Sequence, residues 1–346
     1  TALRLGVQAA AQVRQANPAA HICFYGLYAW LNQDYLLDGP ADSVIAGEAE
    51  AALLALVEAL GAGRPPENVA GISTRAMHAQ PLLQRLRLPV PDRSDLPPLD
   101  KYAAYVDGTV ARKAGYVEAS RGCLHTCTHC PIVPVYGGRF FAVPAEVVLA
   151  DIRQQVAAGA EHITFGDPDF LNGPGHALRL ARALHAEFPR VTFDFTAKVE
   201  HILLHRGLFP ELAALGCTFV TSAIESVSPT VLARLEKGHT AADIDTALAI
   251  LDAAGIALQP TLVAFTPWTT LDDYLAQYRP DDVLFDCTAR NLEYVLEDVG
   301  RGAGVPFKLS FEIMRWTSAV RDHRAGVEPA LIRDKLGLSA VSWQET

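Results

Sequence analysis

The residues with the clearest chemical potential are three cysteines gathered within one short segment. Cys123, Cys127 and Cys130 are spaced as Cx3Cx2C between Arg121 and Pro131. Cysteine thiolates hold iron–sulfur clusters, usually four to a cluster. Because this segment offers only three, one iron of a 4Fe–4S cluster would stay open to an external ligand, as open coordination does at catalytic metals. The spacing therefore favours a catalytic cluster.

An open iron suits a molecule with an adjacent amine and carboxylate. The amino-acid end of S-adenosylmethionine (SAM) could chelate it, and an electron from the cluster could then break a carbon–sulfur bond of the sulfonium. A structural zinc site is one alternative, because His125 and His129 lie among the cysteines and imidazole is a zinc ligand. Three packed, inert thiols are another.

Repeated strand–helix units surround the cysteines. Apolar patterning predicts strands at 115–120, 162–165, 192–196, 219–223 and 257–263. It predicts helices at 143–158, 176–187, 209–215, 229–235 and 241–254. Such units imply a parallel sheet or barrel, in which ligands gather at the carboxyl ends of the strands. We expect an α/β fold with a partial (β/α)6 barrel over residues 112–275, and the cysteines follow its first strand.

Polar residues end the next strands of this pattern. The candidates are Gly166, Asp167, Asp169, Lys198, Glu225 and Ser226. The charged members should converge within about 8 Å of the open side of the cluster, because all lie at carboxyl ends of strands. Taken singly, each could instead belong to a surface salt bridge.

The flanking regions differ from the barrel. Residues 1–88 predict a Rossmann-like α/β domain, with helices at 5–15 and 51–60 and strands at 21–25, 43–46 and 69–72. Residues 89–111 are expected to be a linker, because four prolines between positions 89 and 98 disfavour helix. Residues 276–346 form a C-terminal extension whose pattern predicts no clear fold.

Composition narrows the class of protein. The net charge is −10, which argues against a general nucleic-acid binder because phosphate binding needs clustered Lys and Arg. No apolar run approaches the roughly 20 residues that span a bilayer, and six cysteines in 346 residues are too few for a secreted disulfide scaffold. We expect a cytoplasmic protein in which Cys23 and Cys217 are core residues.

The cysteine spacing after a strand resembles the radical SAM superfamily. The resemblance covers about residues 112–275 and implies a 4Fe–4S cluster, SAM and an electron donor such as flavodoxin or ferredoxin. The family usually has an aromatic residue before the last cysteine, where this chain has His129, which could stack on adenine. The resemblance also implies cofactor contacts. These are Gly166, Asp167 and Asp169 to the methionine amine, Lys198 to its carboxylate, and Glu225 and Ser226 to the ribose.

The N-terminal region has a resemblance of its own. Residues 46–50, Ala-Gly-Glu-Ala-Glu, resemble the end of the cobalamin-binding-like domain that precedes many such barrels. The usual Asp-x-His-x-x-Gly sequence of cobalamin binding is absent from this chain, so we expect cobalamin to be unlikely. The alternative is a degenerate Rossmann-like domain that only packs on the barrel.

Residues 127–140, 165–172 and 265–270 resemble one subgroup, the radical SAM proteins named for a Cys-Cys-Ala-Glu-Pro tail. It includes an enzyme held to transfer a 3-amino-3-carboxypropyl group from SAM to trivalent arsenic. The resemblance implies that reaction here, with arsenite as the small-molecule substrate, although this chain shows no such tail. Arsenic is thiophilic, so Cys287 is a candidate substrate thiol; the alternative is a packed thiol.

Other functions stay open at this level. A 5′-deoxyadenosyl-radical enzyme and a cobalamin-dependent radical methylase are the enzymatic alternatives. A non-catalytic iron–sulfur or zinc protein, such as an electron carrier, is the alternative of another class. Among the enzymes, the geometry of the sulfonium over the open iron decides which carbon–sulfur bond breaks.

Overall fold

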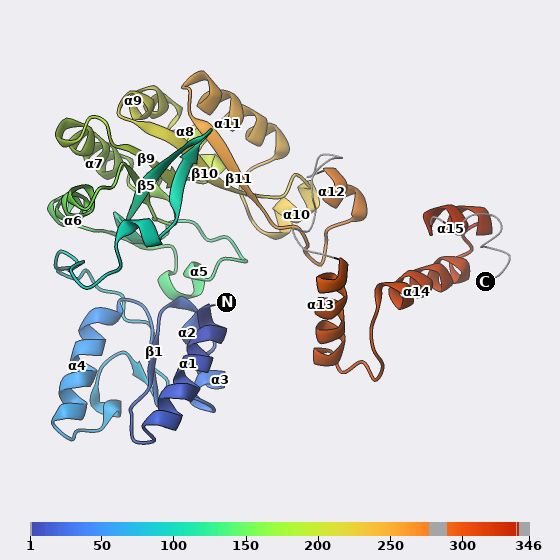
Figure 1. The fold of residues 1–346 in the computed structure, drawn as a ribbon, viewed down its shortest axis with the longest axis horizontal. Helices are drawn as coiled ribbons and strands as arrows, with labels where there is room; N and C mark the ends of the chain where they lie inside the picture. Colours follow the sequence, from blue (N-terminus) through green and yellow to red (C-terminus); the bar gives the residue numbers. More distant parts are fainter. Residues whose placement is uncertain (1, 277–288, 337, 339–346) are drawn as a thin grey trace. The chain divides into compact units, whose positions relative to one another are not determined.

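The computed structural model shows two units, Thr1–Gln277 and Tyr278–Thr346 (Figure 1). It describes residues 2–276, 289–336 and 338. None of the helices in these ranges is long and apolar enough to cross a membrane. The candidate site lies in the first unit.

The first unit begins with a small three-stranded sheet, ordered β1-β2-β3. Its strands are β1 (Cys23–Tyr25), β2 (Ser43–Ile45) and β3 (Ile72–Ser73). β1 and β2 are parallel, whereas β3 pairs antiparallel with β2. The accompanying helices are α1 (Ala2–Ala16), α2 (Leu27–Leu31), α3 (Gln33–Leu37), α4 (Ala49–Gly61) and the 3-10 helix η1 (Pro66–Asn68). The sequence pattern missed α2 and α3, because five residues are too few to show helical periodicity.

A six-stranded sheet follows, ordered β11-β10-β9-β8-β5-β4. Its strands are β4 (Ala104–Asp107), β5 (Val110–Val117), β8 (His162–Phe165), β9 (Thr192–Thr196), β10 (Cys217–Glu225) and β11 (Ala257–Leu262). The strands β5, β8, β9, β10 and β11 pair with one another in parallel. This arrangement confirms the α/β architecture and the five expected strands.

Helices cover one face of this sheet (Figure 1). They are α6 (Ala145–Ala157), α7 (Pro174–Glu187), α8 (Val199–Leu204), α9 (Phe209–Ala214) and α11 (Ala241–Ala253). Figure 1 shows α10 (Pro229–Arg234) and α12 (Leu271–Ala276) to the right of the sheet. The 3-10 helices of this region are η2 (Leu99–Lys101), η3 (Phe170–Asn172) and η4 (Arg206–Leu208). The core between the layers includes Phe165, Phe193 and Phe195, all fully buried. Burial on this scale favours a firm sheet, which can hold loops in place at its edge.

The edge of the sheet differs from expectation. In the described residues five strands are parallel, where a (β/α)6 barrel would have six, and antiparallel β4 occupies one edge. β4 comes from the segment 89–111 that we expected to be a linker. A two-residue turn joins Asp107 to Val110, and Gly108 in it has φ 59°. Two-residue turns of this kind match the twist of the strands and close hairpins. The Asp-Gly pair at 107–108 therefore indicated a hairpin, which we did not predict because the pair follows a proline-rich stretch.

The proline-rich segment before β4 is fastened to the barrel. Arg93 binds both carboxylate oxygens of Asp151 on α6, at 2.5 and 2.7 Å, and donates to the Tyr116 carbonyl at 2.9 Å. Asp151 is only 5% exposed, so its charge depends on this partner. The bond to the guanidinium raises the pKa of Arg93.

Short elements frame the region after β5. They are β6 (Ser120–Gly122), α5 (Ile132–Tyr136) and β7 (Phe140–Ala142), with β6 and β7 antiparallel. The second unit contains α13 (Ala289–Gly302), α14 (Phe311–Arg324) and α15 (Pro329–Lys335). A small core of Ala319, Ile332 and Leu336 joins its last two helices.

Replacing Arg93 by Ala should lower the free energy of unfolding by about 3 kcal/mol, because it leaves a buried carboxylate without its partner. Urea denaturation measures this. Arg153→Ala is the matched control: Arg153 also binds a carboxylate through two bonds, to Glu187, but on the surface. Its loss should cost less than about 1 kcal/mol. Equal effects of the two substitutions would contradict a structural role for the buried pair.

Candidate functional site

The cysteine loop, residues 123–131, begins at a glycine that no other residue could replace without strain. Gly122 has φ 77°, and a Cβ there would lie 2.4 Å from the Arg139 carbonyl oxygen. The next residue, Cys123, donates its N–H to that same oxygen at 3.0 Å. The backbone must therefore turn tightly as β6 ends, which directs the loop away from the sheet.

The three cysteines lie in a partly buried setting. Cys123 and Cys127 are buried and Cys130 is half-buried. Asn172 of η3 faces the first of them, with its amide nitrogen 3.6 Å from Cys123 Sγ and its oxygen accepting the Leu124 N–H at 3.2 Å. Burial raises the pKa of the Cys123 thiol, so the metal-free thiol stays protonated. A bound metal ion would reverse this, because it coordinates the thiolate.

Asp167 follows strand β8 and is buried. Its carboxylate accepts the Ala119 N–H at 2.9 Å and the Ser120 hydroxyl at 2.5 Å. It thereby fixes the chain just before β6. Burial raises its pKa from an ordinary 3.8 to about 6, against the opposing effect of these two hydrogen bonds.

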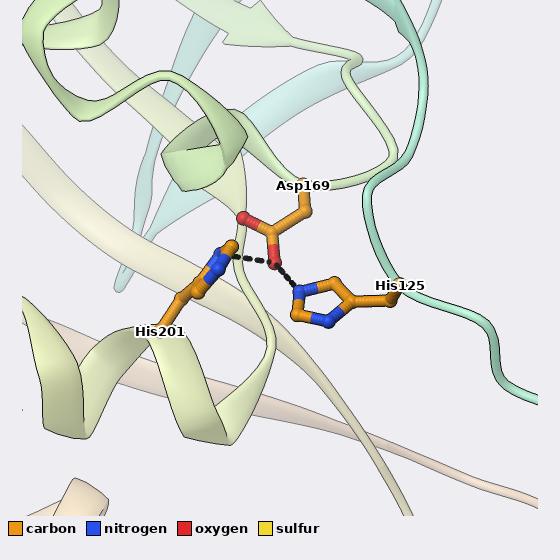
Figure 2. A group of neighbouring side chains, drawn as sticks. All are labelled: His125, Asp169 and His201. Atoms are coloured by element: carbon orange, nitrogen blue, oxygen red, sulfur yellow. Dashed lines mark hydrogen bonds and ion pairs between the residues drawn. The ribbon is translucent and has the colours of Figure 1, made fainter. Parts of the chain in front are cut away.

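Asp169 lies between two imidazoles (Figure 2). One oxygen, Oδ2, is 3.3 Å from Nε2 of His125 and 3.0 Å from Nδ1 of His201, and it accepts the Lys198 N–H at 3.0 Å. The other, Oδ1, accepts the Leu171 N–H at 2.9 Å. Burial would raise the pKa of Asp169, but its contacts with the two histidines outweigh burial and lower it. The group is therefore an ionised carboxylate inside the protein.

Glu225 ends the fourth strand and also contacts the cysteine loop. Its Oε1 is 3.3 Å from Nε2 of His129 and 3.4 Å from Nζ of Lys237. Glu225 has φ 67°, which is uncommon for a residue with a side chain and often marks functional positions. The next residue, Ser226, is buried and accepts the Ser228 N–H at 3.1 Å.

Lys198 and Gly166 complete the set of strand ends. The Lys198 side chain is largely buried and forms an ion pair with Glu200. Gly166 lies under Tyr116, where a Cβ would come within 1.9 Å of the phenol oxygen. Only glycine fits this close approach, and the Tyr116 hydroxyl donates to the Gly166 carbonyl at 3.3 Å.

The strand-end residues thus meet the cysteine loop through different contacts. Asp169 and Glu225 each contact a histidine of the loop, Lys198 reaches Asp169 through its backbone, and Asp167 holds the preceding residues. Cys287 lies outside the described residues. Cys23 is half-buried near β2, whereas Cys217 is buried in β10, where burial raises its thiol pKa.

Two residues at this edge had no role in the sequence interpretation, whereas a third, His239, lies in the segment 237–240 that resembles the ribose-contacting stretch of the superfamily. Asn172 faces Cys123 from η3, and His201 faces Asp169 from α8, a helix of six residues that was too short to predict. His239 is buried, and both its ring nitrogens lack a hydrogen-bond partner among the described residues. Burial and the charge of Lys237 lower its pKa.

A cleft lies between the two sheets of the first unit. Gly26 and Gly47, which follow β1 and β2, line one side, and Ser120 and Gly166 lie among the residues of the other. Beside it, the buried carboxylate of Glu48 accepts the hydroxyl of Tyr136 at 2.8 Å and binds Arg121 at 3.0 Å. Burial and this bond raise the pKa of Tyr136.

One family model matches the central part of the chain. The model of the radical SAM superfamily matches residues 117–269, a span that contains the cysteine loop and the strand ends. Residues 117–269 are therefore similar to a radical SAM domain. The α/β architecture with a curled, half-barrel sheet is typical of such domains.

Relatives of the radical SAM domain are enzymes by name. An uncharacterized methyltransferase of Pyrococcus horikoshii is 29% identical over 207 residues, covering 58% of this chain and 43% of that protein. A tRNA-2-methylthio-N(6)-dimethylallyladenosine synthase of Chlorobium limicola is 26% identical, over 50% of this chain and 40% of that protein. This chain therefore spans less than half the length of these relatives, and the comparisons support an enzyme of the transferase type.

Solved structures share the fold at low identity. The radical SAM methyltransferase TsrM of Kitasatospora setae, with tryptophan and a SAM analogue bound, has a TM-score of 0.64 at 19% identity, covering 77% of this chain and 54% of its own. The cobalamin-dependent radical SAM enzyme OxsB, with aqua-cobalamin and SAM bound, has a TM-score of 0.62 at 19% identity, covering 79% of this chain and 40% of its own.

These structures correct one expectation. We expected cobalamin to be unlikely because its usual sequence is absent. That expectation is wrong, since TsrM with cobalamin bound shares the fold over 73% of this chain and the cobalamin-dependent OxsB shares it over 79%. The absence of the Asp-x-His-x-x-Gly sequence is a poor guide to cobalamin binding, because a fold can hold a ligand through its backbone and its shape.

The raised pKa of Asp167 predicts a pH effect on stability. The folded protein binds the proton of the Asp167 carboxyl more tightly than the unfolded chain does. Protonation of Asp167 therefore adds to the free energy of unfolding at low pH, and this addition is lost as pH rises through about 6. Relative to Asp167→Asn, the wild type should lose about 3 kcal/mol of unfolding free energy between pH 4 and pH 7, from two pKa units. Urea titrations of both proteins across that range measure it, and parallel pH profiles would contradict it.

Proposed function

We propose that Cys123, Cys127 and Cys130 hold a 4Fe–4S cluster in a radical SAM transferase. The donor set fits: three thiols lie on one loop, and the other described cysteines, Cys23 and Cys217, belong to strands of the two sheets. When bound, such a cluster supplies one electron and an open iron for the amino-acid end of SAM. The loop excludes water from two of the thiols by burying them, and a glycine fixes its start.

The strand ends support a SAM site beside the loop. Glu225 and His129 lie side by side. The Glu225 carboxylate suits a ribose hydroxyl of SAM, and the His129 ring suits its adenine. The buried ammonium of Lys198 would favour the methionine carboxylate. Asp167 and Asp169 already accept backbone N–H groups, so we propose that they position the loop around the cofactor, and that the Gly166 backbone lies nearest to it.

One observation favours a two-cofactor enzyme. The cleft is lined by residues that follow β1 and β2 on one side and β5 and β8 on the other. In α/β folds ligands bind outside the carboxyl ends of the strands, so molecules held by the two sheets would meet there. We propose that the N-terminal part is cobalamin-binding-like and that cobalamin, when bound, supplies a carrier for a methyl group. The proposed reaction is methyl transfer to a small molecule.

The cleft can take such a group on the N-terminal side. Gly26 has φ 98°, and a Cβ there would meet no atom within 4 Å, so its backbone is open to a large flat ligand. Tyr25 is 64% exposed and lines the same cleft. We propose that these two residues contact the corrin. Ser120 and Gly166 would face the SAM side.

A second candidate is the transfer of a 3-amino-3-carboxypropyl group to trivalent arsenic. Residues 127–140, 165–172 and 265–270 support it through their resemblance to the subgroup with the Cys-Cys-Ala-Glu-Pro tail. Both candidates need the same cluster and the same SAM site, with an external electron donor such as flavodoxin or ferredoxin. They differ in which carbon–sulfur bond of SAM breaks. Differences of about 1 Å in the positions of the reacting groups decide this.

Alanine at any one of Cys123, Cys127 or Cys130 should abolish the visible absorbance of the reconstituted cluster and all turnover of SAM, because each thiolate is a cluster ligand. Cys23→Ala and Cys217→Ala are matched controls, and both should retain cluster and turnover. Ultraviolet–visible spectra and iron analysis of anaerobically reconstituted protein measure the outcome. A full cluster in any of the first three variants would contradict the ligand assignment.

Protein reconstituted with hydroxocobalamin and freed of excess ligand should retain corrin absorbance. Tyr25→Ala should weaken retention about tenfold, since it removes a ring from the cleft. Tyr28→Ala is the control, an equally exposed tyrosine outside the cleft. A complete absence of retained corrin in the wild type would contradict the two-cofactor proposal.

Product analysis separates the two reactions. Methyl transfer should convert SAM to S-adenosylhomocysteine, whereas aminocarboxypropyl transfer should give methylthioadenosine and, with arsenite, a new arsenic–carbon product. Mass spectrometry of anaerobic reactions with and without arsenite distinguishes them. If 5′-deoxyadenosine is the only SAM-derived product, the radical SAM assignment survives and both transfer proposals fail.

A further inference from the structure

A second cluster of possible metal ligands lies beside the cysteine loop. His125, Asp169 and His201 each offer one ligand atom, and these atoms lie within 4.8 Å of one another. The side chains come from three different segments, namely the cysteine loop, the chain after β8, and α8, and they point toward one another (Figure 2). None of the three is a cysteine, so this set is chemically distinct from the thiols.

The contacts in this group are poor hydrogen bonds. His125 Nε2 lies 3.3 Å from Asp169 Oδ2, whereas a charge-assisted N–H···O bond is usually about 2.7–2.9 Å long. His201 Nδ1 lies 3.0 Å from the same oxygen but is buried without hydrogen-bond geometry. His125 Nε2 therefore makes only a long hydrogen bond to the carboxylate, and His201 Nδ1 lies near it without hydrogen-bond geometry.

The spacing does fit a shared metal ion. Bonds of about 2.0–2.1 Å, usual for zinc with imidazole or carboxylate, place neighbouring ligand atoms about 3.0 Å apart at 90° and about 3.4 Å apart at the tetrahedral angle. The two observed separations, 3.3 and 3.0 Å, match these values. A small shift of each ring would let all three atoms face one point.

The surroundings suit a cation. Asp169 is 1% exposed, so its carboxylate is shielded from water. Glu200 Oε2 is 3.8 Å from Nδ1 of His125, the ring nitrogen that faces away from the cluster of ligand atoms. At this distance Glu200 adds negative charge near His125 but makes no hydrogen bond to it. The positive charge of Lys198 lies nearby and would repel a cation, but its ammonium group is paired with Glu200.

We propose that His125 Nε2, Asp169 Oδ2 and His201 Nδ1 bind one divalent transition-metal ion of the zinc type, separate from the iron–sulfur cluster. Two imidazoles and one carboxylate are a donor set that zinc and similar borderline metals favour. Three protein ligands leave room for water or a substrate group. The ion would join the cysteine loop to the ends of β8 and β9, beside the proposed SAM site.

Zinc binding tests the site directly. Cluster-loaded protein, washed with a weak chelator, is dialysed anaerobically against ZnCl2, and zinc and iron are measured by mass spectrometry. One zinc per chain is expected, with the cluster absorbance unchanged. His125→Gln and His201→Gln should each weaken zinc binding at least tenfold, because each removes a ligand atom. Glu200→Gln should weaken it less, because this carboxylate lies 3.8 Å from His125 Nδ1, beyond hydrogen-bond distance. His205→Gln is the matched control, a histidine beside His201 but outside the ligand set, and it should bind as the wild type does.

The cysteines must be excluded as the zinc ligands. The variant with Ala at Cys123, Cys127 and Cys130 lacks the proposed cluster and should still bind one zinc, which separates this proposal from the cluster assignment. The zinc K-edge absorption spectrum of the wild type should show nitrogen and oxygen neighbours only. Sulfur neighbours, loss of zinc in the cysteine variant, unchanged zinc binding in the His125 and His201 variants, or absence of bound zinc in the wild type would each overturn the proposal.

Discussion

The arrangement of the site depends on one buried carboxylate. Asp169 ties together three segments that are distant in sequence: its oxygens contact His125 of the cysteine loop, the Lys198 N–H after β9, and His201 of α8. A buried carboxylate without such partners would be strongly destabilising. Because its partners come from different strand ends, satisfying this one charge also sets where the cysteine loop lies on the sheet.

The parallel sheet makes this convergence possible. Strands β5, β8, β9 and β10 all run in the same direction, so their following residues emerge at one edge. The phenylalanine core beneath them is fully buried, which keeps that edge firm. The N-terminal part meets the same edge, and Glu48 joins Tyr136 and Arg121 there. Residues that follow the parallel strands of both sheets therefore line a common cleft.

The sequence predicted the repeated strand–helix units of the large sheet well. The cysteine spacing and the apolar runs of β8, β9 and β10 are local patterns, and the structure has these strands where they were expected. It predicted the remaining parts less well. α8 is too short for periodicity, so His201 was missed, and β4 was hidden after a proline-rich stretch. The error about cobalamin arose because a missing short sequence was given more weight than the strand-end geometry, which only the fold shows.

The central claim is that three cysteines hold a cluster with one iron open to SAM. The most direct measurement is the electron paramagnetic resonance spectrum of the reduced, reconstituted protein, recorded with and without SAM. The account predicts the signal of a reduced 4Fe–4S cluster whose g-values shift when SAM is added, because the cofactor binds the open iron. A signal that is the same with and without SAM would contradict it.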